Sequence, residues 1–98
     1  MDVVFGDEDL RRLADDARFN MGIPPHLVSR FRSRVQTLRA ANDTRDLRAM
    51  KSLHFEKLKG NRSHQYSIRL NHRYRIILEL THESGEQAVT LLGIEDYH

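Results

Sequence analysis

Hydrophobic positions follow a helical period in the first half of the chain and alternate with polar positions after residue 50. After a short apolar run at 3–5, apolar side chains recur every three or four positions, the spacing that buries one face of a helix. We predict an edge strand at 3–5 and helices that begin after Asp7, at Pro24-Pro25 and at Asp43. Their inward positions are Leu10, Leu13, Ala14 and Ala17, then Val28, Phe31, Val35 and Leu38, then Leu47 and Met50.

Two alternating segments, at 65–70 and 73–80, predict half-buried strands joined by a tight turn. A two-residue turn would pair Ile68 with Arg75 and bring charge into the core. A three-residue turn at 71–73 instead pairs Ile68 with Ile76 and keeps the apolar side chains on one face. After a turn at 83–86, a last strand is expected at about 87–95, beside this hairpin.

Helices followed by antiparallel strands predict an α+β fold, a single domain over residues 1–98. Two to three N-terminal helices are expected to pack on one face of a small, mainly antiparallel sheet and to leave the other face for function. The 98 residues include no cysteine, which excludes disulfides, cysteine-based zinc sites and thiol nucleophiles. Neither a signal peptide nor a bilayer-spanning apolar run is recognisable, so we expect a cytoplasmic protein that does not contact membranes.

Charge is distributed unevenly along the chain. Residues 29–75 hold thirteen Lys and Arg against three Asp and Glu, whereas the segments on either side are net acidic. Such a basic block is typical of a protein that binds a polyanion, most commonly a nucleic acid. Arg30, Arg32 and Arg34 lie between core positions of one helix and are expected to be simply solvated.

The predicted register places Arg69 directly opposite Arg75 on the outer face of the hairpin. Like charges in this position destabilise a sheet, and a phosphate that bridges the two guanidiniums would offset that cost. The alternative is that the two arginines splay into water, where their repulsion is weak. Lys57, Lys59 and Arg62, just upstream, favour the phosphate.

The last three residues, Asp96, Tyr97 and His98, bring a carboxylate, a phenol and an imidazole to the end of the final strand. Together these groups can provide an acid, a base and a hydrogen-bond donor close to one another. A frayed polar terminus is the simpler alternative. A histidine metal site is disfavoured because no two of the six histidines have helical i,i+4 spacing.

Four segments, 58–62, 66–71, 74–76 and 95–98, resemble the HigB toxins of the RelE superfamily, the plasmid maintenance killer proteins of bacterial toxin–antitoxin pairs. The sequences are Leu-Lys-Gly-Asn-Arg, Tyr-Ser-Ile-Arg-Leu-Asn, Tyr-Arg-Ile and Glu-Asp-Tyr-His. The resemblance runs from about residue 54 to the end, while the helical half matches in pattern only. It implies an RNase that enters the A site of the 70S ribosome, cuts mRNA without a metal or cofactor, and is neutralised by a HigA-like antitoxin.

The resemblance also implies roles for individual residues. Arg75 would stabilise charge on the scissile phosphate, and Lys59 would hold the phosphate or RNA backbone. Asp96, Tyr97 and His98 would position and transfer protons. Many relatives have His-Pro-Leu-Lys-Gly around the lysine, but here Glu56 stands at the place of that histidine and His54 is displaced, so either is a candidate base.

The basic side chains expected to bind RNA are Lys57, Arg62, Arg69 and Arg73. Arg75→Ala is expected to abolish activity and to leave the fold intact, on the assumption that Arg75 is exposed. The alternative function is a non-catalytic RNA- or ribosome-binding module that uses the same basic face. A DNA-binding protein is a distant third, because no helix-turn-helix pairing is evident.

Overall fold

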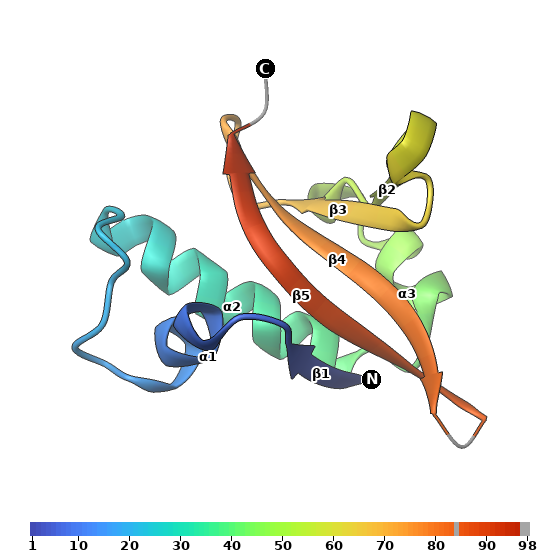
Figure 1. The fold of residues 1–98 in the computed structure, drawn as a ribbon, viewed down its shortest axis with the longest axis horizontal. Helices are drawn as coiled ribbons and strands as arrows, with labels where there is room; N and C mark the ends of the chain where they lie inside the picture. Colours follow the sequence, from blue (N-terminus) through green and yellow to red (C-terminus); the bar gives the residue numbers. More distant parts are fainter. Residues whose placement is uncertain (84, 97–98) are drawn as a thin grey trace.

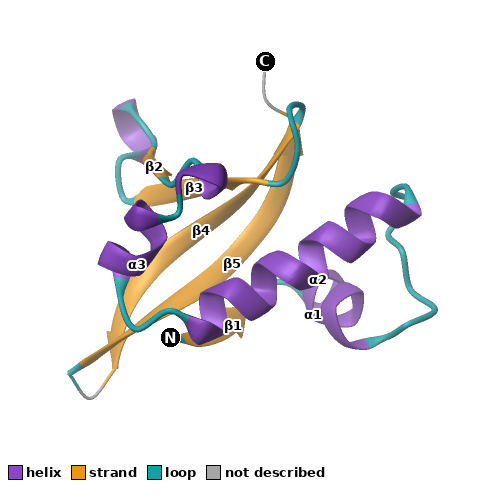
Figure 2. Ribbon diagram, turned by 180° about the vertical axis from the view of Figure 1, so that it is seen from behind, coloured by secondary structure: helices purple, strands orange, loops and turns teal. Residues whose placement is uncertain are grey.

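The computed structural model describes residues 1–83 and 85–96. Three helices lie on one face of a five-stranded sheet, as the opposite views of Figure 1 and Figure 2 show. The helices are α1 (Glu8–Asp15), α2 (Pro25–Ala40) and α3 (Thr44–Ala49). The strands are β1 (Asp2–Phe5), β2 (Glu56–Lys57), β3 (Gln65–Arg69), β4 (Tyr74–Glu83) and β5 (Glu86–Asp96), in the order β1-β5-β4-β3-β2. The predicted α+β fold is confirmed.

Local chemistry explains where the helices begin. The Asp7 side chain accepts a hydrogen bond from the Asp9 N–H, and the Asp43 side chain accepts one from the Arg45 N–H, so both aspartates cap a helix. Pro25 opens α2, where its missing N–H costs nothing. α1 ends at Asp15, earlier than predicted, so Ala17 lies outside the helix and is exposed.

The β3–β4 hairpin has the predicted register. Ile68 pairs with Ile76, and Leu70 N–H donates to the Tyr74 carbonyl oxygen across the three-residue turn 71–73. Arg69 lies opposite Arg75, as expected. The predicted edge strand is confirmed as β1, which pairs in parallel with β5. The two-residue strand β2 was not predicted; it adds an antiparallel edge to β3.

The core lies between the helices and the sheet. Phe31 and Leu38 from α2 and Ile76 and Leu78 from β4 are fully buried there. The prediction for Met50 is wrong, because this side chain is 42% exposed. α3 ends at Ala49, and a 3-10 turn, η1 (Lys51–Leu53), then brings Leu53 into the core instead.

No helix in the described part of the chain has both the length and the apolar character needed to cross a bilayer.

Candidate functional site

The sheet face that α1, α2 and α3 leave uncovered carries the candidate site. Neighbouring residues of a strand point to opposite faces, so Ser67 and Arg75 lie on the face opposite the buried Ile68 and Ile76. Glu56 pairs directly with Ser67 and therefore shares their face. We call this surface near the β3–β4 turn the open face; its polar side chains are Glu56, Ser67, Arg69, Arg75 and Glu95.

Arg75 is buried at the centre of the open face, with only 7% of its surface exposed. Its Nη1 donates to the Ser67 hydroxyl at 3.0 Å and to the Glu56 carboxylate at 3.1 Å. The expectation that Arg75 is exposed is therefore wrong. Arg75 is buried because β2 extends the sheet beyond β3 and brings the Glu56 carboxylate beside a side chain that would otherwise be exposed.

Of the two candidate bases, Glu56 is the one that the structure brings to Arg75. The carboxylate is half exposed, and only its Oε2 is hydrogen-bonded to a described residue. His54 ends η1 in a left-handed backbone conformation, with φ of 48°, and its ring is exposed. The His54 imidazole has no hydrogen bond or ion pair with the described residues.

Two further arginines at the site are paired with carboxylates of β5. Both guanidinium Nη groups of Arg62 donate to Glu95, at 3.0 and 2.7 Å, while Arg62 Nε donates to the Gln65 side chain at 2.9 Å. Arg73 Nε donates to Asp96 at 3.0 Å. These hydrogen bonds raise the pKa of Arg62 and of Arg73 above the ordinary arginine value.

The remaining predicted site residues are distributed as follows. Arg69 lies on the open face, but Lys57 pairs with Tyr66 and so lies on the opposite face of the sheet from Glu56. Lys59 is exposed and immediately precedes the 3-10 turn η2 (Gly60–Arg62). Asp96 pairs with Tyr74, the residue before Arg75, so its position in the strand is on the opposite face of the sheet from Glu95 and Arg75.

Tyr97 and His98, the other two members of the predicted terminal trio, lie outside the described residues.

Sequence reasoning missed two residues of this site, Ser67 and Glu95. Ser67 is completely buried although it lies on the face without helices, and it is one of the two described hydrogen-bond partners of Arg75 Nη1. Glu95 lies directly opposite Arg75 across the β4–β5 pairing. Ser67 could have been found from the hairpin register itself, and Glu95 by continuing that register into the last strand.

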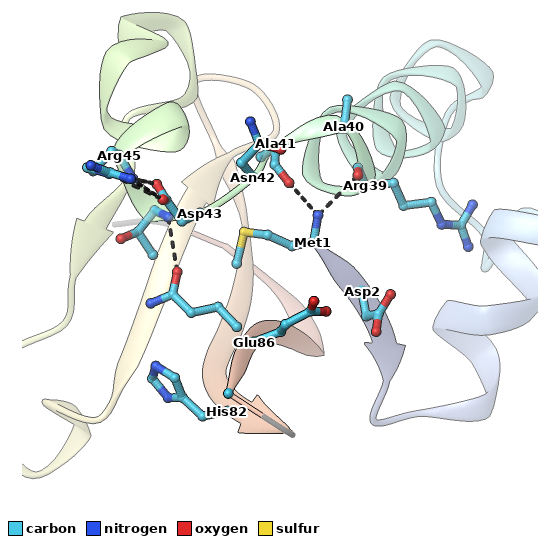
Figure 3. Close-up of a pocket in the computed structure, with 13 residues that line it drawn as sticks. Met1, Asp2, Arg39, Ala40, Ala41, Asn42, Asp43, Arg45, His82 and Glu86 are labelled. Atoms are coloured by element: carbon cyan, nitrogen blue, oxygen red, sulfur yellow. Dashed lines mark hydrogen bonds and ion pairs between the residues drawn. The ribbon is translucent and has the colours of Figure 1, made fainter.

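A separate hollow of about 800 Å³ lies where the α2–α3 connection, the amino terminus and the β4–β5 hairpin meet (Figure 3). Its wall includes His82, seven residues along β4 from Arg75 and therefore about 23 Å away. Polar groups here bind one another: Asp43 pairs with Arg45, and the Met1 ammonium donates to the Arg39 carbonyl at 3.1 Å and to that of Ala41. The hollow is therefore remote from the chemistry of the open face.

No three His, Asp or Glu side chains are grouped as metal ligands within residues 1–83 and 85–96.

Comparison with solved structures defines the class of the fold as that of the RelE-like toxins. The YoeB/ParE toxin from Agrobacterium tumefaciens superposes with a TM-score of 0.55 at 16% identity, over 100% of both chains. A YoeB–YefM complex from Staphylococcus aureus gives 0.56 at 18% identity, over 100% of this chain and 97% of that one. The toxin–antitoxin complex RelBE2 from Mycobacterium tuberculosis gives 0.54 at 16% identity, over 98% and 96%. A search of curated proteins found no match.

The sequence itself identifies the family. Residues 3–98 match the model of the HigB-like toxins, described as RelE-like toxins of the type II toxin–antitoxin system HigB. The protein belongs to this family, and it is a type II toxin of the RelE superfamily.

Proposed function

We propose that this toxin is an endoribonuclease that inhibits translation by cutting mRNA in the A site of the ribosome, without a metal ion. The observation that supports this most directly is the position of Arg75, held by Glu56 and Ser67 on the uncovered face of the sheet. A guanidinium fixed in advance is suited to stabilising a phosphate whose negative charge increases in the transition state.

The proposed reaction is an internal transfer within the RNA. Glu56 removes the proton from a 2′-hydroxyl, the 2′-oxygen attacks the neighbouring phosphorus, and the bond from phosphorus to the 5′-oxygen breaks. His98, positioned by Asp96 and Tyr97, donates a proton to the leaving 5′-oxygen. Lys59 and Arg75 bind the phosphate oxygens throughout. The products are a 2′,3′-cyclic phosphate and a 5′-hydroxyl.

The role of Glu56 is tested with purified toxin on translating ribosomes, by mapping the new 5′-ends of the mRNA. Glu56→Gln keeps the size of the side chain but loses the base, so cutting should fall by about 10² to 10⁴-fold. Glu56→His provides a different base at the same place and should retain much more activity. Glu8→Gln is the matched control, because Glu8 is also an exposed glutamate paired with an arginine, Arg11.

The result of this experiment also chooses between the candidate bases. If Glu56→Gln cuts like the wild type and His54→Gln does not, then His54 is the base. A protein that binds ribosomes but leaves no new mRNA ends is the non-catalytic binding module, and the endonuclease proposal is then wrong.

A modified substrate separates attack by the 2′-oxygen from attack by a water molecule that a metal ion activates. An mRNA with a single 2′-deoxyribose at the cutting position should resist this toxin completely, because the attacking oxygen is missing. A water molecule activated by a metal ion would still cut that mRNA and would leave a 5′-phosphate. The same substrate, with Mg²⁺ kept constant to preserve the ribosome, therefore distinguishes the two mechanisms.

We also propose that a cognate HigA-like antitoxin binds and neutralises this protein. Support comes from the family and from two of the structural neighbours, which are complexes of a toxin with its antitoxin. Co-expression with the product of an adjacent small gene should restore growth, and the two proteins should purify together. Continued growth arrest in the presence of every neighbouring small protein would contradict this partner.

A further inference from the structure

The strand that carries Glu56 is the shortest in the sheet. β2 comprises only Glu56 and Lys57, which pair with Ser67 and Tyr66 of β3. Figure 2 shows β2 at the edge of the sheet, where its outer side pairs with no other strand of the described chain. An edge strand with so few hydrogen bonds to its neighbour opens easily unless side chains also hold it in place.

The two residues of β2 are not themselves buried. Glu56 and Lys57 are both exposed. His54, two residues before Glu56, is exposed as well and turns the chain in a left-handed backbone conformation. Half-buried apolar side chains lie at the two ends of the strand, Phe55 before it and Leu58 after it. Phe55 is directly bonded to Glu56 along the chain, so its side chain is the nearest anchor for the carboxylate.

Phe55 is held by an aromatic stack. Its ring lies parallel to that of Tyr66, with 2° between the ring planes and 5.1 Å between the centroids. The Arg48 guanidinium of α3 lies 5.0 Å from the centroid of the Phe55 ring. Stacked rings attract each other, and so do a cation and an aromatic face. Phe55 is therefore tied both to β3, through Tyr66, and to α3, through Arg48.

The stack and the Glu56 carboxylate lie on opposite faces of the sheet. Tyr66 packs against the core, while Ser67, the next residue of β3, contacts Arg75 on the open face. Phe55 stacks on Tyr66 and also packs against the core. Glu56, the next residue, is on the open face. The ring contact below the sheet therefore fixes β2 against β3, and with it the distance of 3.1 Å between Glu56 Oε2 and Arg75 Nη1 above the sheet.

We propose that the stack of Phe55 on Tyr66, together with Arg48, positions Glu56 as the base for RNA cleavage. Phe55 is a positioning residue, because it acts through Glu56 and not on the RNA itself. This inference rests on the proposed function, in which Glu56 removes the proton of the 2′-hydroxyl. Without the stack, β2 would separate from β3 for part of the time, and the carboxylate would then be out of reach of that proton.

The test follows single-turnover cutting of mRNA on ribosomes at increasing concentrations of toxin. Phe55→Leu keeps an apolar side chain but loses the flat ring, so the maximal rate should fall by about 10- to 100-fold. The half-saturating concentration of toxin should not change, because Glu56 acts in the transition state and not in binding. Phe55→Tyr keeps the ring and should restore the wild-type rate.

A second half-buried phenylalanine provides the matched control. The Arg12 guanidinium lies 4.0 Å from the centroid of the Phe19 ring, so Phe19→Leu also removes a contact between an arginine and an aromatic ring. Phe19 follows α1, which carries no residue of the open face, and its replacement should leave the maximal rate unchanged. Should Phe55→Leu fail to fold, Tyr66→Leu decides, because it removes the same stack from the side of β3.

A double substitution separates the positioning of Glu56 from a general loss of structure. In the Glu56→Gln variant the base is already absent, so adding Phe55→Leu should lower the remaining rate no further. If Phe55→Leu lowers the rate by the same factor with and without Glu56, or if the single variant cuts at the wild-type rate, the inference is overturned. If Glu56→Gln itself cuts as the wild type does, the proposed base is wrong, and this outcome is distinct from both.

Discussion

Replacing Arg75 with alanine should remove a structural contact as well as the proposed phosphate ligand. The Ser67 hydroxyl is completely buried and loses its donor, which costs about 1 to 3 kcal/mol. The two lost methylene groups of the buried arginine stem add about 1.6 kcal/mol. The variant no longer loses the conformational entropy of a buried arginine side chain on folding, which offsets about 2 kcal/mol of this sum. Loss of the ion pair with Glu56 adds little to the destabilisation, because the half-exposed Glu56 carboxylate is then solvated by water.

The net destabilisation is therefore about 1.6 kcal/mol at the middle of this range, which in a domain of this size lowers Tm by about 6 to 13 °C. Thermal unfolding followed by circular dichroism measures this shift. Ser67→Ala in the same background removes the orphaned hydroxyl and should recover part of the loss, with a coupling energy of about 1 kcal/mol. If Arg75→Ala melts within about 2 °C of the wild type, the contact with Ser67 does not stabilise the fold and this reasoning is refuted.

Three other perturbations have defined outcomes. Gly6→Ala should cost about 1 to 3 kcal/mol, because its Cβ would lie 2.9 Å from the Leu91 carbonyl oxygen, whereas Gly93→Ala, with open space around its Cβ, should be neutral in the same melting assay. An extension before Met1 should lower Tm relative to the unextended chain, because it removes the ammonium group that binds the carbonyls at the end of α2. Deleting His98 should abolish mRNA cutting without changing Tm; a fully toxic deletion variant would exclude this residue as the proton donor.

The hairpin could be predicted from sequence because its information is local. Alternation over several residues fixed which side chains face the core, and the requirement to keep Ile68 opposite Ile76 fixed the length of the turn. The sequence signals for the capped starts of α1 and α3, Asp7 and Asp43, were equally local. Met50 was misassigned because the helical period extends one residue too far, and nothing in the sequence shows that η1 changes the direction of the chain there.

The arrangement of the candidate site could not be predicted in the same way. Glu56 reaches Arg75 only because β2 pairs with β3, and a strand of two residues is too short to show any alternation. The position of β2 depends on pairing with β3 and not on the sequence of β2 itself. Sequence reasoning therefore identified most of the candidate groups, while the contact of Arg75 with Glu56 depends on the pairing of β2 with β3.

If the proposed function is correct, the ion pairs of the site should differ in how readily an RNA phosphate replaces their carboxylates. Arg62 and Arg73 are substantially exposed and are paired with exposed carboxylates of β5, and such pairs contribute little to stability. They can exchange a carboxylate for a phosphate at little cost, which suits contacts along a variable backbone. Arg75 is buried and also bound to Ser67, so in the proposed mechanism it would keep its position when RNA binds. A fixed arginine at the centre and exchangeable arginines around it would let one site hold many sequences while presenting a single phosphate for cleavage.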